Sequence, residues 1–160
     1  MTSQVLTEQA SAALDVWVRL LRGHAALTRD LNAQLVAEHG LTINDFEALL
    51  HLSRAEDGSL RRVDLAERLV LTPSGVTRLL DGLERSGLVE KGACATDLRV
   101  TYAVITAAGR ERLTAAGESH LAAVRASFEE RFSEPELATL REFLGRLPGA
   151  GGGDGAECTP

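Results

Sequence analysis

The stretch Leu65–Thr106 reads LAERLVLTPSGVTRLLDGLERSGLVEKGACATDLRVTYAVIT and decides the fold class of this chain. It holds two short helical patterns separated by three residues, and Gly87 ends the second pattern. Two runs with strand character follow, joined by a polar loop. A helix-turn-helix followed by a β-hairpin has this order of elements, so the stretch predicts a winged helix whose chemistry points to DNA.

The second helix of this pair has the clearest start and stop signals. The Thr72 hydroxyl is placed to accept an orphan amide, and Pro73 fits the first helical turn, where its missing N–H costs nothing. Gly87 and Leu88 supply the stop, with Leu88 placed for the apolar contact of a Schellman end. We expect this helix to bury one aliphatic side, formed by Val76, Leu79, Leu80 and Leu83.

Working outward, further helices flank this unit. Residues 10–38 have apolar positions near helical spacing and end at Gly40, and Thr42 with Asp45 caps the next helix. A helix over about 63–69 precedes Thr72, and Leu60 begins a very short strand.

The hairpin strands cover 88–91 and 99–105, where Val100, Tyr102 and Val104 alternate with Arg99, Thr101 and Ala103 as in a half-buried strand. Thr106 then caps a long helix, and the pair Ser133 and Glu136 opens the last one.

The predicted fold is therefore mainly α with a small β-hairpin wing: a winged helix-turn-helix core plus long N- and C-terminal dimerisation helices. We expect one domain over 1–148, with dimerisation helices at 10–38 and 106–147 and a DNA-binding unit at 42–105. The Gly-rich segment 149–160 is expected to be a disordered tail. Apolar stripes on the flanking helices exceed what the winged-helix unit can cover, which favours a dimer, although such stripes also occur as ordinary core.

Composition sets the class of protein. The chain has 160 residues, 44% of them apolar and only 4% aromatic, so leucine, valine and alanine must build the core of a globular protein. No apolar run reaches the roughly 18 residues of a membrane span, and residues 1–9 lack the features of a secretory signal. We expect a cytoplasmic protein without a membrane partner, in which Cys94 and Cys158 are reduced thiols.

The net charge of −6 does not by itself suggest a DNA-binding protein, but its distribution permits one. Residues 1–53 and residues 102–160 each carry a net charge of −3, whereas residues 54–101 hold 8 basic and 8 acidic side chains. A neutral segment still presents a basic face when its carboxylates point elsewhere.

The side of the 73–85 helix opposite its aliphatic residues is small and polar, which suits contact with phosphate and base edges, although the same pattern fits a solvated surface. In the hairpin loop, Asp97 is placed to orient Arg99 into the minor groove, with a surface ion pair as the alternative. Two arginines before the 63–69 helix are placed to contact backbone phosphate, with solvated surface charges as an equal alternative. The candidate DNA-binding residues are Arg61, Arg62, Thr72, Ser74, Gly75, Thr77, Arg78, Lys91, Asp97 and Arg99.

Residues 42–110 resemble the MarR family of bacterial transcriptional regulators. The resemblance lies in LTINDFEALLHLSR from Leu41, in LAERLVLTPSGVTRLLDGLERSGLVEK from Leu65 and in TDLRVTYAVITAAGRE from Thr96. It implies a dimer of winged helices that binds a palindromic operator, usually as a repressor released by small aromatic or phenolic acids. The wing departs from the family pattern, because Leu98 replaces a basic residue and the tip from Gly92 has few charges.

Two kinds of signal could act on such a regulator. The resemblance implies a ligand cleft beside the dimer helices, for which Trp17, His24, Phe46 and His51 are candidates, although Trp17 also fits a dimer core. Cys94 in the wing is a candidate redox switch, provided that a nearby cation lowers the pKa of its thiol.

Other functions find less support in the sequence. The four histidines lack metal-ligand spacing, and no catalytic constellation or phosphate-binding loop stands out, so we expect no metal, no cofactor and no enzymatic activity. The leading hypothesis is a DNA-binding, ligand-responsive repressor. The alternatives are a winged-helix protein-interaction module with little or no DNA binding, and a redox-responsive regulator that acts through Cys94.

Overall fold

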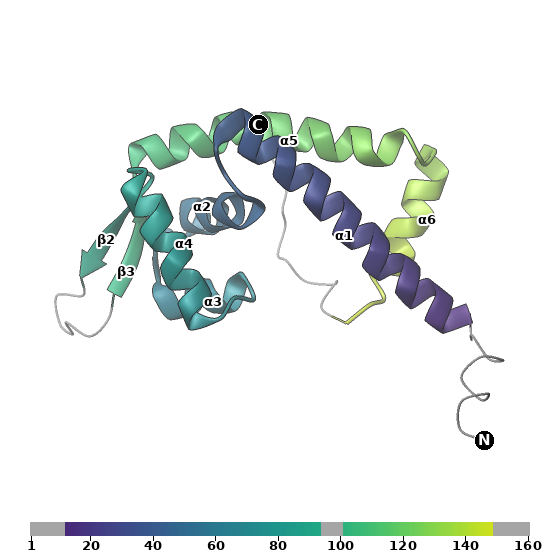
Figure 1. The fold of residues 1–160 in the computed structure, drawn as a ribbon, viewed down its shortest axis with the longest axis horizontal. Coiled ribbons are helices and arrows are strands. Elements are labelled where there is room, and N and C mark those ends of the chain that lie inside the picture. The colour runs from purple at the N-terminus through teal and green to yellow at the C-terminus, as the bar shows by residue number, and fades with distance from the viewer. Residues whose placement is uncertain (1–11, 94–100, 149–160) are drawn as a thin grey trace, which may run out of the picture. The chain divides into compact units, whose positions relative to one another are not determined.

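The structure is a computed structural model that describes residues 12–93 and 101–148 (Figure 1). The chain forms two compact units, one ending at Leu121 and one beginning at Ala122. The predicted disordered tail at 149–160 lies outside the described residues.

The described elements follow the predicted order. Seven helical segments and three strands succeed one another as α1 (Ala12–His39), α2 (Ile43–Arg54), the 3-10 turn η1 (Glu56–Gly58), β1 (Ser59–Arg61), α3 (Arg62–Arg68), α4 (Pro73–Arg85), β2 (Val89–Ala93), β3 (Thr101–Ile105), α5 (Ala107–Glu129) and α6 (Glu134–Leu144). The fold is mainly helical with a small antiparallel sheet, which confirms the predicted winged-helix class.

Side-chain caps fix where the helices begin. At α2, the Thr42 hydroxyl accepts the amide of Asp45 at 3.1 Å, and the Asp45 carboxylate accepts the amide of Thr42 at 2.9 Å. At α4, the Thr72 hydroxyl accepts the amide of Gly75 at 3.1 Å. Both caps satisfy amides that have no partner within the helix, as the sequence predicted.

The end of α4 is a Schellman turn. Gly87 has φ +71°, a conformation that favours glycine, and its amide donates to the Glu84 carbonyl at 3.0 Å. The Leu88 amide donates to the Leu83 carbonyl at 3.0 Å, and both leucines are buried. This turn sends the chain directly from the helix into the wing.

The three strands form one antiparallel sheet in the order β1-β3-β2. The register pairs Leu60 with Ala103 and Lys91 with the same residue from the other side. The alternation seen in the sequence is present, but Ala103 and Ile105 are the buried residues of β3, whereas Tyr102 and Val104 are half-buried. The larger apolar side chains of Tyr102 and Val104 therefore do not mark the face of β3 that packs against the core. That face carries Ile105, at the end of the strand, and the small Ala103.

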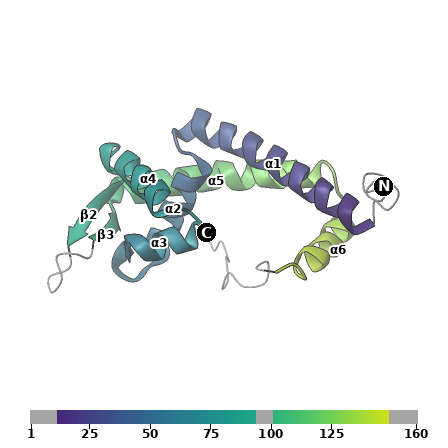
Figure 2. The same cartoon turned by 60° about the horizontal axis from the view of Figure 1, so that its bottom comes forward.

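The core of the first unit lies between the helices α2, α3 and α4 and the sheet, which gather together in Figure 2. Val76, Leu80 and Leu83 of α4 are each at most 2% exposed, and Leu49 and Leu52 of α2 are fully buried. Burying an aliphatic side chain of this size contributes about 2 kcal/mol each, so this contact holds α4 in place. Leu79, predicted to be buried, is half-buried at the edge of the same cluster.

The long helices remain largely exposed. In α1 the buried residue is Leu35, whereas Trp17 is 54% and Val16 63% exposed. In the single chain α6 has no buried residue, and its Leu144 is 36% exposed. None of the described helices has the length and apolar character needed to cross a membrane.

The start of α5 is fastened to the end of α4. The Thr106 amide donates to the Leu88 carbonyl at 3.1 Å, and the Thr106 hydroxyl donates to the Gly87 carbonyl at 2.7 Å. Gly109, one turn into α5, lies so close that a Cβ there would overlap the Leu88 carbonyl oxygen. Glycine is therefore required at this point by the approach of two backbones.

We predict that Gly109→Ala lowers the free energy of unfolding by at least about 2 kcal/mol, because the added methyl group meets backbone that cannot move aside. Gly117→Ala is the matched control on the same helix, since a Cβ there has nothing within 4 Å. The control should stabilise the protein by roughly 0.5 to 1 kcal/mol through helix propensity. Urea unfolding of both variants tests this, and equal effects of the two substitutions would contradict it.

Candidate nucleic-acid interface

The outer side of α4 carries the polar residues expected to meet DNA. Ser74, Thr77 and Arg78 are exposed, while Val76 between them is 2% exposed. The buried aliphatic side therefore fixes the rotation of the helix and leaves these three side chains turned to solvent. This division agrees with the sequence prediction for the helix.

Local hydrogen bonds restrict what the hydroxyls of this surface can do. The Thr77 hydroxyl donates to the Pro73 carbonyl at 2.9 Å, so its oxygen is left to accept a hydrogen bond. The hydroxyl oxygens of Thr72 and Ser74 lie 3.2 Å apart within hydrogen-bonding distance. In this arrangement Thr77 suits a donor on a base edge, such as the amino group of adenine or cytosine.

Gly75 is half-buried and lies against the helix cap. A Cβ at this position would be 3.2 Å from the Thr72 hydroxyl oxygen, closer than is usual for such a contact. The absence of a side chain thus leaves room for the capping hydroxyl of Thr72.

The four described basic candidates fall into two groups. Arg61 is bound by Asp64, with nitrogen-to-oxygen distances of 2.7 and 2.6 Å, and this pairing holds the pKa of the Asp64 carboxyl below its usual range. Lys91 lies 3.0 Å from the Glu84 carboxylate. Arg62 and Arg78 have no ion pair or hydrogen-bond partner for their guanidinium groups within the described residues.

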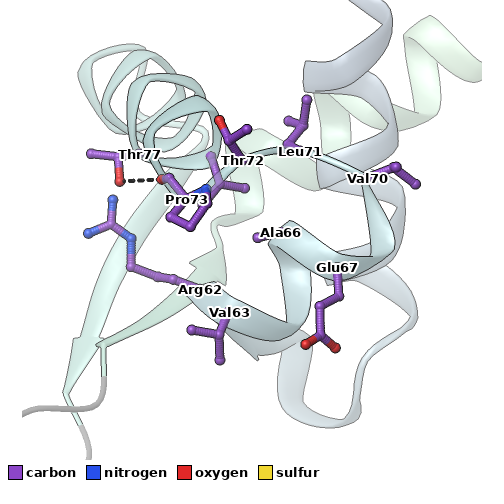
Figure 3. A pocket seen from close by; sticks show the side chains of 10 residues that line it. Arg62, Val63, Ala66, Glu67, Val70, Leu71, Thr72, Pro73 and Thr77 are labelled. Carbon is purple, nitrogen blue, oxygen red and sulfur yellow. Dashed lines mark hydrogen bonds between the residues drawn. The ribbon is translucent and has the colours of Figure 1, made fainter.

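Arg62 lies beside the start of α4. Figure 3 shows its side chain rising from α3 toward Thr77, and its Nη2 atom is buried without a hydrogen-bond partner. A buried unpaired guanidinium nitrogen is costly unless an acceptor arrives, so this atom marks a place for an oxygen ligand such as a phosphate.

A groove of about 730 Å³ runs between α3 and α4 next to Arg62 (Figure 3). Val70 in the turn between the helices is 91% exposed and has φ +52°, a left-handed conformation that is unfavourable for a branched side chain. Sequence reasoning did not find this groove, because its existence depends on how the two helices pack. Its lining residues are Arg62, Val63, Ala66, Glu67, Val70, Leu71, Thr72, Pro73, Val76 and Thr77.

The predicted wing residues Cys94, Asp97 and Arg99 lie outside the described residues. The wing strands that lead to them are described, from Val89 and from Thr101. The roles assigned to the three wing residues therefore stay predictions.

Comparison with known proteins agrees with this geometry. The sequence profile of the MarR family matches residues 39–99, which contain α2, the helix-turn-helix and the first wing strand. The crystal structure of AbsC, a MarR family transcriptional regulator from Streptomyces coelicolor, matches 86% of this chain and 93% of that chain with a TM-score of 0.75 and 29% identity.

The chain belongs to the MarR family.

Two further relatives agree with membership of this family of DNA-binding transcriptional regulators. It is 32% identical over 111 residues to the HTH-type transcriptional repressor YetL of Bacillus subtilis, a match covering 69% of this chain and 66% of that protein's length. Sco3205, a MarR family regulator from Streptomyces coelicolor solved in complex with DNA, has 26% identity and a TM-score of 0.73 and covers 80% of each chain. The MarR family consists of regulators without enzymatic activity, in agreement with the absence of a catalytic motif in the sequence.

The four candidate ligand residues of this MarR-family protein are placed as follows. Trp17 and His24 are exposed on α1, and His24 lies 3.5 Å from the Thr28 hydroxyl. His51 on α2 is half-buried, and burial, followed by the charges of Arg68 and Arg54, lowers the pKa of its imidazole. Phe46 on α2 packs against a residue that sequence reasoning had passed over, His120 of α5, with 5.0 Å between ring centroids.

A polar cluster lies close in sequence to His120, where α1 ends against α5. The Ser119 hydroxyl lies 2.6 Å from His39 Nε2 and accepts from the Gln34 amide at 3.2 Å. Within the described residues, the buried atoms Gln34 Oε1 and His120 Nδ1 have no hydrogen-bond partner. Neither this cluster nor any other part of the described ranges holds a group of three or more metal-ligating side chains.

We predict that His120 makes the stability of the protein depend on pH. Burial lowers the pKa of its imidazole, so the folded state resists protonation, whereas the unfolded chain takes up the proton at about pH 6.5. The free energy of unfolding should be at its full value above this pH and should fall as the pH drops below it.

Urea unfolding at a series of pH values should show a smaller loss of stability for His120→Leu than for the unchanged protein. His51→Leu is a useful comparison, because the pKa of His51 is also lowered by burial and it accounts for part of the same loss. Identical pH dependence in His120→Leu and the unchanged protein would show that His120 stays protonatable in the folded state.

Proposed function

We propose that this protein is a homodimeric, ligand-responsive transcriptional repressor that binds a palindromic DNA operator. The observation that carries the proposal is the placement of Ser74, Thr77 and Arg78 on the exposed side of a helix whose other side is locked into the core. In this proposal α4 enters the major groove and the wing residue Arg99 reaches the neighbouring minor groove. A regulator of this kind acts in the cytoplasm, where a bacterial chromosome lies.

The repressor assignment and the DNA partner are supported by relatives. YetL is named as a repressor, and Sco3205 was solved in complex with DNA. The guanidinium groups of Arg62 and Arg78, which have no partner in the part of the chain that the structure describes, provide two positive charges for phosphate or guanine next to the start of α4.

The exposed apolar side chains of the long helices support the dimer. Exposed apolar side chains that gather into a large patch mark interaction surfaces, and a two-fold symmetric reader of DNA needs two copies of the recognition helix. Half-sites should lie about one helical turn, 10 to 10.5 base pairs, apart. In α1 these side chains include Val16, Trp17 and Leu21, and in the second unit Phe132, Phe143, Leu144 and Leu147.

The response to a ligand rests on the polar cluster near His120. Gln34 Oε1 and His120 Nδ1, which lack partners among the described residues, suit donor and acceptor groups of a small molecule, and the rings of Phe46 and His120 suit an aromatic or phenolic body. A ligand that binds one dimer shape more tightly than another would shift the distance between recognition helices and weaken operator binding.

A second candidate is a protein-interaction module with little or no DNA binding. The acidic net charge of −6 favours it, as does the pairing of Arg61 and Lys91 with carboxylates. Gel-shift titration against the DNA upstream of the protein's own gene separates the two candidates. Oxidation of Cys94 as the signal is a further proposal, tested by repeating this titration after treatment with peroxide.

We predict that Arg62→Ala and Arg78→Ala weaken operator binding, because each removes a positive charge that has no partner among the described residues. For a phosphate contact, the slope of log K against log salt should fall by about one unit. Arg99→Ala should also weaken binding. Fluorescence anisotropy with a labelled operator at several salt concentrations measures both quantities.

Arg61→Ala is the matched control for Arg62→Ala, since its charge is already compensated by Asp64. We expect it to leave the salt slope close to that of the unchanged protein, and size-exclusion chromatography should show an intact dimer for all four variants. If Arg62→Ala and Arg78→Ala both bound with unchanged affinity, the surface assigned to DNA would be incorrect.

A further inference from the structure

The ion pair between Glu84 and Lys91 joins the recognition helix to the wing. Glu84 lies in the last turn of α4 and Lys91 in the middle of β2, and Glu84 Oε2 is 3.0 Å from Lys91 Nζ. The Glu84 side chain is only 20% exposed, whereas that of Lys91 is 57% exposed. The Glu84 side chain is thus largely covered by protein, while the Lys91 side chain that binds it reaches into solvent.

The backbone brings these two side chains together. Leu83, the neighbour of Glu84, is buried in the core, so Glu84 lies at the edge of the apolar side of α4. In β2, Val89 and Lys91 point to the same face, because side chains of a strand alternate, and Val89 is 2% exposed against the core. The ion pair therefore lies next to the apolar contact between α4 and β2, on the solvent side of its last buried residues.

The surrounding charges leave Glu84 as the partner of Lys91. Arg85, next along α4, donates instead to the Asp81 carbonyl at 3.0 Å. Glu90 is exposed and points to the opposite face of β2, since it precedes Lys91 by one residue. Lys91 is therefore engaged within the protein before any DNA arrives.

We propose that Glu84 and Lys91 are a positioning pair that fixes the wing relative to the recognition helix, and that Lys91 is not a phosphate contact. This inference rests on the proposed function of DNA binding. It reverses the simple expectation from charge: Glu84 is an acid on the recognition helix, yet it favours DNA binding because it holds the wing in place. Its role is indirect, through Lys91 and β2.

The experiment measures operator affinity and salt slope for Glu84→Gln, Lys91→Gln and the double variant. The probe is the tightest duplex selected by the unchanged protein from a random library of about 30 base pairs, long enough for two half-sites. Each single variant should bind about fivefold more weakly, and the double variant no more weakly than either single one, because all three lose the same interaction. Lys91→Gln should keep the salt slope of the unchanged protein.

Two further variants separate positioning from general charge effects. Glu90→Gln changes the net charge by the same amount as Glu84→Gln. Because Glu90 lies on the face of β2 opposite Lys91, this variant should not weaken binding. The exchanged variant Glu84→Lys with Lys91→Glu rebuilds the pair in reverse and should recover most of the lost affinity. A phosphate contact by Lys91 would instead be abolished by the exchange, since a carboxylate would then face the DNA.

Several results would overturn the positioning pair. These are tighter binding by Glu84→Gln, unchanged binding by both single variants, additive losses in the double variant, or a slope about one unit smaller in Lys91→Gln. Circular dichroism and thermal unfolding identify any variant that fails to fold. If a single variant does, the affinity of the exchanged variant decides whether the pair positions the wing.

A measurement without DNA keeps this inference separate from the proposed function. Amide hydrogen exchange of the paired strands β2 and β3 should be faster in Glu84→Gln than in Glu90→Gln, because the ion pair no longer restrains β2. If the unchanged protein selected no duplex, the proposed function would fail while the exchange data still decided on the pair. Equal exchange rates in the two variants would exclude the positioning role.

Discussion

The burial of one side of α4 is the constraint on which the rest of the structure depends. Val76, Leu80 and Leu83 are held between α2, α3 and the sheet, and each contributes about 2 kcal/mol to that contact. Because a helix has only one rotation that buries these residues together, the side chains on the opposite side are directed outward. The same packing places α3 beside the start of α4 and so creates the groove where the Arg62 guanidinium lies.

Local chemistry is what the sequence predicts well. The caps by Thr42 and Thr72 and the turn at Gly87 involve residues within a few positions of one another, and the structure has them where expected. Periodicity likewise identified the buried side of α4. The winged-helix class followed from the order of these signals, and the family relationship agrees with it.

Contacts between distant segments were not predictable in the same way. The sequence did not separate Arg61 from Arg62, because which arginine meets Asp64 depends on the turn from β1 into α3. The partner of Lys91 and the contact of Phe46 with His120 both join residues brought together only by packing. In β3, the choice between two alternating faces was decided by the neighbours of Ala103 and Ile105, which no pattern within the strand reveals.

The junction at Gly109 has a mechanical consequence. Here the backbone of α5 touches the backbone of the residue that begins the wing, and Thr106 bonds to both Gly87 and Leu88. Side chains at most helix contacts can adapt to small shifts by changing rotamer. At Gly109 no side chain separates the backbone of α5 from the Leu88 carbonyl. A rotation of the first part of α5 about its own axis would therefore move Leu88, and with it the start of β2, because no side chain can adjust to absorb the change.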